Sequence, residues 1–390
     1  MNGGLRVLIV SQQFRPLVGG YERAAERLAA GLAAAGHDVT VLTERRNPRW
    51  AAHEDGPGYA IRRLWCIHRP HRHLLTSTLS ATMFLLLNLR RFQIVHVQQY
   101  GIYAAVVIVM ARLFSVPVVL RTTSTRSMGI GQVLGGRSPI MQLVAALHRK
   151  VDACIVTTTW ALEEVLRFGI PRDRIRLIPN GVDTGELRPD ETARREARSR
   201  LVPDSNVLMV LYCGRLDEAK NPLGLVRAWR AIARKTPNAL LALVGDGPQY
   251  GLVRQLVYQE GLEERVLLAG EQASVLPWYL AADVFVLCSH FEGQSNALLE
   301  AMSCGLPVVS TKVSGSVDIF SECDVGELVE VDDDVALASA ISQLIDEPER
   351  RNECGVRARQ YAESKYSINS VVRQTLDLYQ AVIDRARPVN

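Results

Sequence analysis

The residues best suited to chemistry stand in a loop and helix that follow the apolar run Val284–Leu287. Two glutamates, Glu292 and Glu300, lie eight positions apart there. The residues that follow the first glutamate are Gly293, Gln294, Ser295, Asn296 and Ala297. Such a loop-to-helix entry offers free backbone N–H groups and a positive dipole end to a phosphate, and carboxylates bind sugar hydroxyls through charge-assisted hydrogen bonds. The pattern predicts a site for a phosphorylated sugar; the alternative is an ordinary helix that merely exposes Glu300.

Two cations follow the run Val207–Cys213. Arg215 and Lys220 would stand at the carboxyl end of a strand, where ligands bind in parallel sheets. They would neutralise a diphosphate and stabilise the charge that it gains as a leaving group. The alternative is that Lys220 is a solvated loop charge that pairs with Asp217.

A glycine pair opens the first helical segment. Gly19 and Gly20, with Tyr21 after them, follow the strand-like run Arg6–Val10. Paired glycines let the backbone approach a ligand closely, or form a tight turn.

Short apolar runs alternate with helical patterns along the chain, and this predicts parallel sheets covered by helices on both faces. The strand-like runs are Arg6–Val10, Asp38–Thr43, Ile94–Val97, Val116–Arg121, Ala153–Thr157 and Ile175–Ile178, then Val207–Cys213, Leu240–Val244, Val266–Leu268, Val284–Leu287 and Val308–Ser310. The helical patterns between them are Glu22–Ala35, Leu75–Arg91, Tyr103–Phe114 and Trp160–Phe168, then Leu223–Lys235, Tyr250–Gly261 and Asn296–Cys304. The turn Pro179–Asp183 marks a junction. We therefore expect an α/β chain of two doubly wound domains, residues 1–180 and 181–365, facing a cleft, with a final helix over 366–390.

Composition excludes several classes. At 390 residues and 48% hydrophobic, the chain is not disordered, collagen-like or a coiled coil. Its seven cysteines are scattered and never spaced C-x-x-C, which disfavours a zinc framework or disulfides and favours a reducing, cytoplasmic setting. Neither a signal peptide nor 18 consecutive apolar residues is evident. The absence of G-x-G-x-x-G and of a P-loop motif argues against dehydrogenases and P-loop enzymes.

Charge is divided unevenly along the chain. Residues 1–180 contain 23 basic and 10 acidic side chains, a net of +13, whereas residues 181–390 contain 22 and 31, a net of −9. A basic half favours an anionic partner such as a phosphorylated substrate or an acidic membrane surface; the alternative is a basic surface that only complements the acidic half. Nucleic acid is disfavoured because no recognition motif is present.

Together these motifs resemble glycosyltransferase family 4, whose members have the two-domain GT-B fold. The resemblance runs nearly the full length and depends on the order and spacing of many short motifs. They are Gly19-Gly20, Ala35–Thr43, Ile178–Asp183, Gly214–Leu216 with Lys220, Val244–Pro248, Ala282–Val286, the pair Glu292 and Glu300, and Glu300–Val309.

The resemblance implies a retaining transfer of a sugar from a UDP- or GDP-linked donor to a hydroxyl, without a metal or other cofactor. Glu292, Arg215 and Lys220 would be catalytic: Glu292 would hold the donor sugar near the reacting carbon, and the two cations would clamp the diphosphate. Gly293 to Ala297 would cradle the sugar and diphosphate, Glu300 would bind ribose hydroxyls, and Gly20 would line the phosphate side. The first domain would bind the acceptor, the second the donor, and the last helix would pack on the first domain.

One departure from the family concerns a histidine that many relatives have after the strand Val116–Arg121. Here Thr122 stands at or near that position. A retaining transfer in which the leaving phosphate accepts the proton needs no such base. Thr122 and Thr123 then join Gly19 and Tyr21 as expected acceptor-binding residues. His96, within an apolar run, is interpreted as structural.

A charge-free, leucine-rich stretch, Leu74–Leu89, lies between basic residues. These are Arg69, Arg72, Arg90 and Arg91. Such a helix can lie in an anionic membrane interface, or it can bury its leucines in the first domain. We therefore expect a saccharide or lipid-linked acceptor in polysaccharide or glycolipid synthesis. A same-fold epimerase or hydrolase and a non-catalytic sugar-nucleotide-binding protein remain the alternatives.

Overall fold

The computed structural model describes residues 4–17, 19–67, 69, 72–122, 129–136, 138–202, 204 and 206–386. The chain forms two compact units. The first runs to Gly181 and resumes at Ile368, and the second comprises Val182–Ser367. The boundary falls within the turn Pro179–Asp183.

A mainly parallel sheet forms the centre of the first unit. Its strands are β1 (Arg6–Val10), β2 (Asp38–Arg45), β3 (His53–Asp55), β4 (Ala60–Trp65), β5 (Ile94–Val97), β6 (Val118–Thr122), β7 (Ala153–Val156) and β8 (Ile175–Leu177). The order is β3-β4-β2-β1-β5-β6-β7-β8, and the pairs are parallel except β3 with β4. Successive side chains enter opposite faces, so Leu8 and Val10 join one core and Ile9 the other.

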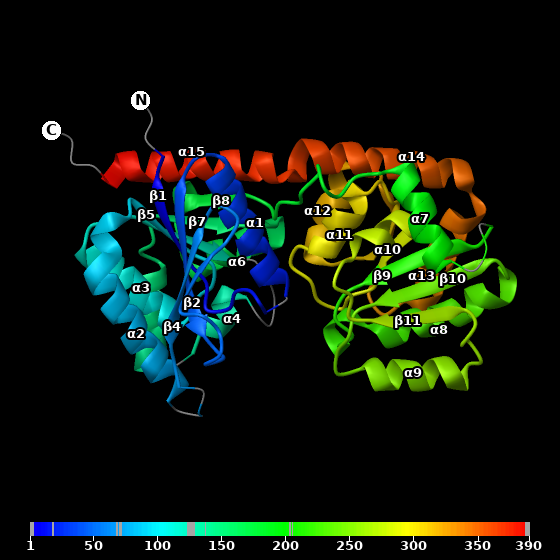
Figure 1. Cartoon of the computed structure of the whole chain (residues 1–390), viewed down its shortest axis with the longest axis horizontal. Coiled ribbons are helices and arrows are strands. Elements are labelled where there is room, and N and C mark those ends of the chain that lie inside the picture. Colours follow the sequence, from blue (N-terminus) through cyan, green and yellow to red (C-terminus); the bar gives the residue numbers. More distant parts are fainter. Residues whose placement is uncertain are drawn as a thin grey trace. The chain divides into compact units, whose positions relative to one another are not determined.

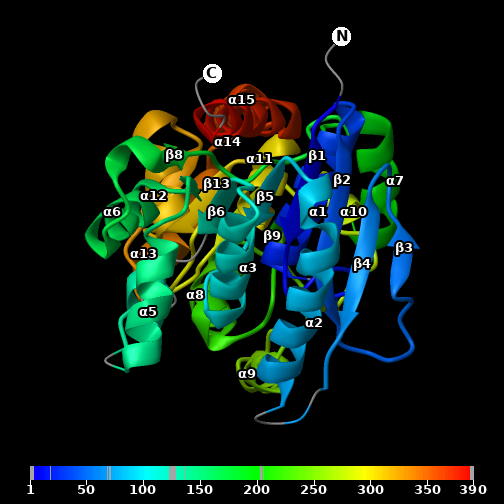
Figure 2. The same cartoon turned by 90° about the vertical axis from the view of Figure 1, so that its left-hand side faces the viewer.

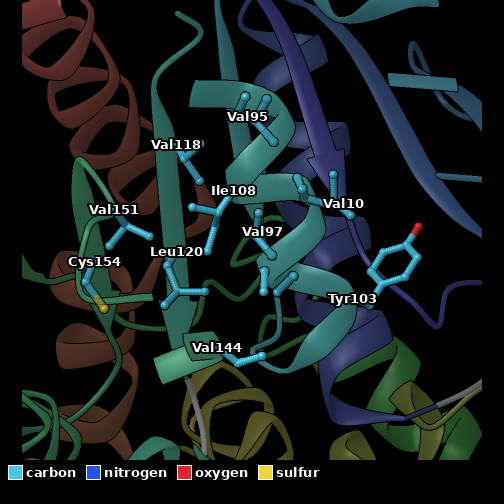
Figure 3. Close-up of a cluster of buried hydrophobic side chains, with 14 of the residues drawn as sticks. Val10, Val95, Val97, Tyr103, Ile108, Val118, Leu120, Val144, Val151 and Cys154 are labelled. Atoms are coloured by element: carbon cyan, nitrogen blue, oxygen red, sulfur yellow. The ribbon is translucent and has the colours of Figure 1, made fainter. Parts of the chain in front are cut away.

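Helices cover both faces of this sheet. They are α1 (Gly20–Ala34), α2 (His73–Asn88), α3 (Ile102–Leu113), α4 (Ile130–Leu134), α5 (Pro139–His148), α6 (Thr159–Phe168) and α15 (Ile368–Ala386). The helices α1 and α15 pack on one face, and α2 to α6 pack on the other. Figure 2 shows α2, α3 and α5 side by side. Figure 3 shows the core between this face of the sheet and its helices, where aliphatic side chains of β1, β5 and β6 pack against Ile108 of α3.

The last helix belongs to the first unit although the second unit precedes it in sequence. Gly31 in α1 allows a close approach, because a Cβ there would lie 2.6 Å from Val372 Cγ2 of α15. The hydroxyl of Tyr379 in α15 hydrogen-bonds Nδ1 of His96 in β5, and both side chains are buried. His96 thus has the structural role that its apolar run indicated.

The second unit is built around a six-stranded parallel sheet. Its strands are β9 (Leu208–Cys213), β10 (Ala239–Val244), β11 (Val266–Gly270), β12 (Val284–Leu287), β13 (Val308–Thr311) and β14 (Gly326–Val329). Their order is β11-β10-β9-β12-β13-β14, and every pair is parallel. The strand order reverses direction between β9 and β12, where ligands bind in open α/β sheets.

Helices also cover both faces of the second sheet (Figure 1). They are α7 (Glu191–Leu201), α8 (Pro222–Lys235), α9 (Tyr250–Gln259), α10 (Leu276–Ala281), α11 (Asn296–Ser303), α12 (Ser314–Glu322), α13 (Asp334–Asp346) and α14 (Pro348–Tyr361). One core contains side chains of α8, α9 and α13, and the other contains side chains of α7, α10, α11, α12 and α14.

The predicted fold class is confirmed: each half is a sheet between helices, parallel in the second unit and parallel except for β3 in the first. Periodicity did not predict α7, which is strongly charged. This helix forms because Asp190 caps its N-terminus and because Arg194 and Arg198 both pair with Asp283. Among the described residues, none of the helices is both long enough and apolar enough to span a bilayer.

Candidate active site

Two loops meet because the strands that precede them are parallel neighbours. Val284 and Phe285 of β12 lie opposite Val210 and Leu211 of β9, so both strands end at the same edge of the sheet. The backbone N–H of His290 donates to the carbonyl of Ala219 at 2.8 Å. The loop after β9 and the loop after β12 are thereby fastened to each other.

Lys220 and Glu292 form an ion pair across these loops. Both side chains are partly exposed. Burial lowers the pKa of Lys220 to about 8, although the negative charge of Asp217 opposes the shift. The pair places one cation and one carboxylate together at the strand ends, where a ligand can reach them.

The alternative partner of Lys220, Asp217, has a different role. It caps the short 3-10 turn Glu218–Lys220, since its Oδ1 accepts from the backbone N–H of Lys220 at 3.2 Å. Its Oδ2 lies 3.6 Å from Nε of Arg215. The Arg215 side chain is 68% exposed, so it is available to an anion.

The loop that holds Arg215 rests on the glycine-rich turn after β10. Gly245 has φ +135°, and a Cβ there would lie 2.0 Å from the carbonyl oxygen of Gly214. A Cβ at Gly247 would lie 2.4 Å from the carbonyl oxygen of Leu216. Only glycine permits this contact, and it supports the backbone on which Arg215 stands.

Helix α11 begins at Asn296, as predicted. Ser295 caps it, its Oγ accepting from the backbone N–H of Leu298 at 3.3 Å. This helix N-terminus follows directly after Gly293 and Gln294.

A second helix supports this loop. The N–H of Gly315 in α12 donates to the carbonyl of Gly293 at 2.7 Å, and a Cβ at Gly315 would lie 2.9 Å from Gln294 Cα. Sequence reasoning missed this contact. The signal that could have found it is Ser314-Gly315-Ser316 directly after β13.

Glu300 lies in a different environment from Glu292. It is 1% exposed, so the alternative of an exposed Glu300 is wrong. Its Oε2 accepts a hydrogen bond from the Tyr279 hydroxyl at 2.9 Å. Burial, with the negative charges of Cys213 and Glu300, raises the pKa of Tyr279. Tyr279 was not predicted as a site residue, because nothing in the sequence of α10 distinguishes it from a core aromatic residue.

The remaining predicted residues belong to the first unit. Gly19 is the N-cap of α1, and a Cβ there would lie 2.3 Å from Oε2 of Glu22. The Glu22 carboxylate folds back over the start of its own helix, and a side chain at position 19 would displace it. Gly20 is the first residue of α1, and Tyr21 after it is 39% exposed.

Thr122 is the last residue of β6 and is buried, whereas Thr123 lies outside the described residues. The preceding residue, Arg121, is also buried. It donates to the carbonyl of Pro179 at 3.2 Å and to Oδ1 of Asn180 at 2.8 Å. The end of β6 is therefore linked to the segment where the first unit ends.

Within the second unit, the structure brings Lys220 and Glu292 into contact. Arg215 and Gly293 to Ser295 lie in the same two strand-end loops, and Asn296 and Ala297 are the first residues of α11. A cavity of about 590 Å³ in this unit lies elsewhere, and Arg254 and Tyr258 of α9 are among its lining residues. None of the predicted residues lines that cavity.

Comparison with known proteins agrees with this arrangement. Residues 19–181 match a glycosyl transferase 4-like domain, and residues 193–361 match glycosyl transferases group 1. The D-inositol 3-phosphate glycosyltransferase of Xylanimonas cellulosilytica is 31% identical over 265 residues, which cover 65% of this chain and 61% of that relative.

Two solved structures have the same fold over nearly the whole chain. Sucrose-phosphate synthase from Thermosynechococcus elongatus is 25% identical with a TM-score of 0.82, covering 98% of this chain and 100% of the other. Anabaena HepE in complex with UDP-glucose is 18% identical with a TM-score of 0.78, covering 97% and 100%. The chain belongs to the family 4 glycosyltransferases and has their GT-B fold.

Proposed function

We propose that this glycosyltransferase moves a sugar from a UDP- or GDP-linked donor to a hydroxyl of a saccharide or lipid-linked acceptor, with retention of anomeric configuration. The observation that carries the proposal is the Lys220–Glu292 ion pair beside the N-terminus of α11. HepE, which shares the fold, is described in complex with UDP-glucose. In this proposal the second unit binds the donor and the first unit binds the acceptor.

The two cations serve the diphosphate in this scheme. Lys220 exchanges its contact with Glu292 for a phosphate oxygen, and the exposed Arg215 binds a second one. The N–H groups after Gly293 complete the anion site. Fixed positive charge at the leaving group stabilises the transition state, so the scheme requires neither a metal nor a cofactor.

The two glutamates bind different parts of the donor, Glu292 the transferred sugar and Glu300 the ribose. Glu292, released from Lys220, accepts hydrogen bonds from the transferred sugar, with Gly293 to Ala297 around it. Glu300 receives the ribose hydroxyls, and Tyr279 orients its carboxylate through one oxygen. A buried carboxylate with a fixed partner is preorganised, which reduces the entropy that binding costs.

Retention requires no basic side chain at Thr122. The bond between the anomeric carbon and the phosphate oxygen breaks, the bond to the acceptor oxygen forms on the same face, and the acceptor proton passes to the departing phosphate. Gly19, Gly20, Tyr21, Thr122 and Thr123 remain the proposed residues of the first unit, with Gly20 on the phosphate side.

The proposal includes attachment to an anionic membrane surface, supported by the outer face of α2. Leu75, Leu79, Met83, Leu86 and Leu87 are all more than half exposed there. Helix α3, beside α2, adds Leu113, which is 72% exposed. Large contiguous apolar patches mark interaction sites. This face supports an acceptor that is lipid-linked and a role in polysaccharide or glycolipid synthesis.

Donor identity is tested by thermal unfolding with a panel of UDP- and GDP-linked sugars. A donor at 100 times its dissociation constant adds about 2.7 kcal/mol to the free energy of unfolding. Glu300→Gln should reduce the increase, whereas Glu327→Gln, a substitution in β14, should preserve it. Absence of stabilisation by every nucleotide sugar would contradict the proposed donor class.

Product analysis with a labelled donor tests the reaction itself. Labelled sugar should appear in product only when an acceptor is present, and its anomeric configuration should equal that of the donor. An inverted product would contradict the retaining mechanism.

A further inference from the structure

A cluster of possible metal ligands lies in the first unit, among residues to which no role has been assigned above. Glu44 is near the end of β2, Cys66 follows β4, and His73 is the first residue of α2. Strands β2 and β4 are parallel neighbours, with Arg45 opposite Trp65, so their ends lie together. One ligand atom from each of the three residues lies within 4.8 Å of the others.

The distances suit a tetrahedral ion after small side-chain movements. Oε2 of Glu44 lies 3.0 Å from Nε2 of His73. Ligand bonds of about 2.0–2.1 Å at tetrahedral angles would separate these two atoms by about 3.3 Å, and would separate the sulfur from the nitrogen by about 3.6 Å. Glu44 is buried, whereas Cys66 and His73 are partly exposed, so an ion has a route of entry.

The surrounding groups hold the Glu44 carboxylate in place and leave its oxygens room for a further ligand. The Gln12 side-chain amide donates to Glu44 Oε1 at 3.4 Å, and Arg46 Nε lies 3.3 Å from Oε2. The Arg46 side chain is partly exposed, so it can turn toward solvent when another cation arrives.

Tyr103 provides an independent observation at the same place. It is 3% exposed, and its hydroxyl has no hydrogen-bond partner among the described residues. In Figure 3 this hydroxyl points away from the aliphatic side chains of the core. Burial raises the pKa of Tyr103, and the charges of Glu44 and Cys66 add to the shift. An unpaired buried hydroxyl is costly, and a ligand beside Glu44 and Cys66 would satisfy it.

We propose that Glu44, Cys66 and His73 bind one Zn²⁺, with a water as fourth ligand that hydrogen-bonds the Tyr103 hydroxyl. A thiolate, an imidazole and a carboxylate form a ligand set typical of zinc. Binding releases the thiol proton of Cys66 to solvent, and the two anionic ligands then balance the ion's charge. His68 and His71 lie outside the described residues.

The consequence of the site is structural. The ion joins the ends of β2 and β4 to the first turn of α2, the helix whose outer face carries the exposed leucines. All three ligands belong to the first unit, so the site is separate from the Lys220–Glu292 pair. Metal binding contributes to folding where it joins distant segments.

Cobalt binding to the full-length chain, made without a histidine tag and stripped of metal, tests the proposal. Co²⁺ should produce a thiolate-to-cobalt charge-transfer band at one equivalent, and Zn²⁺ should displace it. Cys66→Ser should abolish the band. The matched control Cys323→Ser, at a partly exposed cysteine of the second unit, should retain it.

Two further variants keep the test decisive. Zn²⁺ affinity, measured by competition, should fall about 10–100-fold in Tyr103→Phe, as for other partners of metal-bound groups, and further in His73→Gln. His53→Gln, at an exposed histidine of β3, should leave the affinity unchanged. The absence of a charge-transfer band in the wild type, or its persistence in folded Cys66→Ser, would overturn the site. If Cys66→Ser does not fold, an unchanged Zn²⁺ affinity in His73→Gln would overturn the proposed site.

Discussion

At the scale of single residues, Glu292 and Glu300 have the same side chain but different surroundings. We therefore expect their substitution to affect different kinetic constants. Glu292→Ala should reduce kcat severely, because its contact is made beside the reacting carbon. Glu300→Ala should mainly raise KM for the donor, because ribose contacts are equal in the ground and transition states. Steady-state kinetics with varied donor separates the two effects, and wild-type kcat in Glu292→Ala would exclude the assigned role.

The second prediction at this scale concerns the positive charge of Lys220. Loss of one electrostatic stabiliser costs about 2.7–4 kcal/mol of transition-state stabilisation, so Lys220→Ala should slow transfer by about 100-fold or more. Added Mg²⁺ should neither speed the wild type nor rescue the variant. A strict requirement for added divalent metal would contradict the metal-free scheme.

The pH profile provides a further check on Lys220. Its pKa of about 8 means that the free enzyme loses this positive charge as pH rises through 8. Therefore kcat/KM, which reports groups of the free enzyme, should fall above about pH 8. Lys220→Arg should remove that decrease, because arginine stays charged. An identical decrease in the variant would show that another group is responsible.

At the scale of elements, the anchoring of α15 on β5 makes stability depend on pH. Burial, with the charge of Arg121, lowers the pKa of His96 from 6.5 to about 3. The unfolded chain therefore binds more protons than the folded chain between these values, and the free energy of unfolding decreases as pH falls through this window. Between pH 6.5 and 4.5 the loss should be about 2–3 kcal/mol.

Denaturant unfolding across this pH range measures the effect. His96→Phe should flatten the pH dependence, even if the variant is less stable at every pH. His53→Gln serves as an exposed control and should keep the wild-type slope. An unchanged slope in His96→Phe would assign the pH dependence to other groups, such as His148, whose pKa burial also lowers.

At the scale of the whole molecule, the net +13 of residues 1–180 and the exposed face of α2 favour binding to anionic vesicles. Each basic residue near such a surface contributes about 1 kcal/mol, and salt screens the attraction. The protein should sediment with anionic vesicles at low salt, less with neutral ones, and dissociate as salt increases. Changing Arg69, Arg72, Arg90 and Arg91 to glutamine should weaken binding.

A control with the same change of charge distinguishes a specific surface from net charge. Changing Arg188, Arg195, Arg200 and Arg234 of the second unit to glutamine alters four exposed side chains and should leave vesicle binding nearly intact. Equal losses in both variants would show that only total charge matters. No binding by the wild type at low salt would exclude the membrane surface.

The sequence by itself determined the two parallel sheets, the start of α11 and the set of donor-site candidates. Apolar runs, caps and glycines are local properties, and local properties decide strands, helix ends and turns.

Only the tertiary structure decided which candidates meet. Lys220 pairs with Glu292 rather than Asp217 because β9 and β12 are neighbours, although 72 residues separate the pair. The sequence shows no zinc-binding spacing for Glu44, Cys66 and His73. Their side chains come together only because β2 pairs with β4 and α2 begins nearby. Burial of Glu300 and exposure of the α2 leucines were likewise decided by packing, since one amphipathic or apolar segment can face a core or a surface.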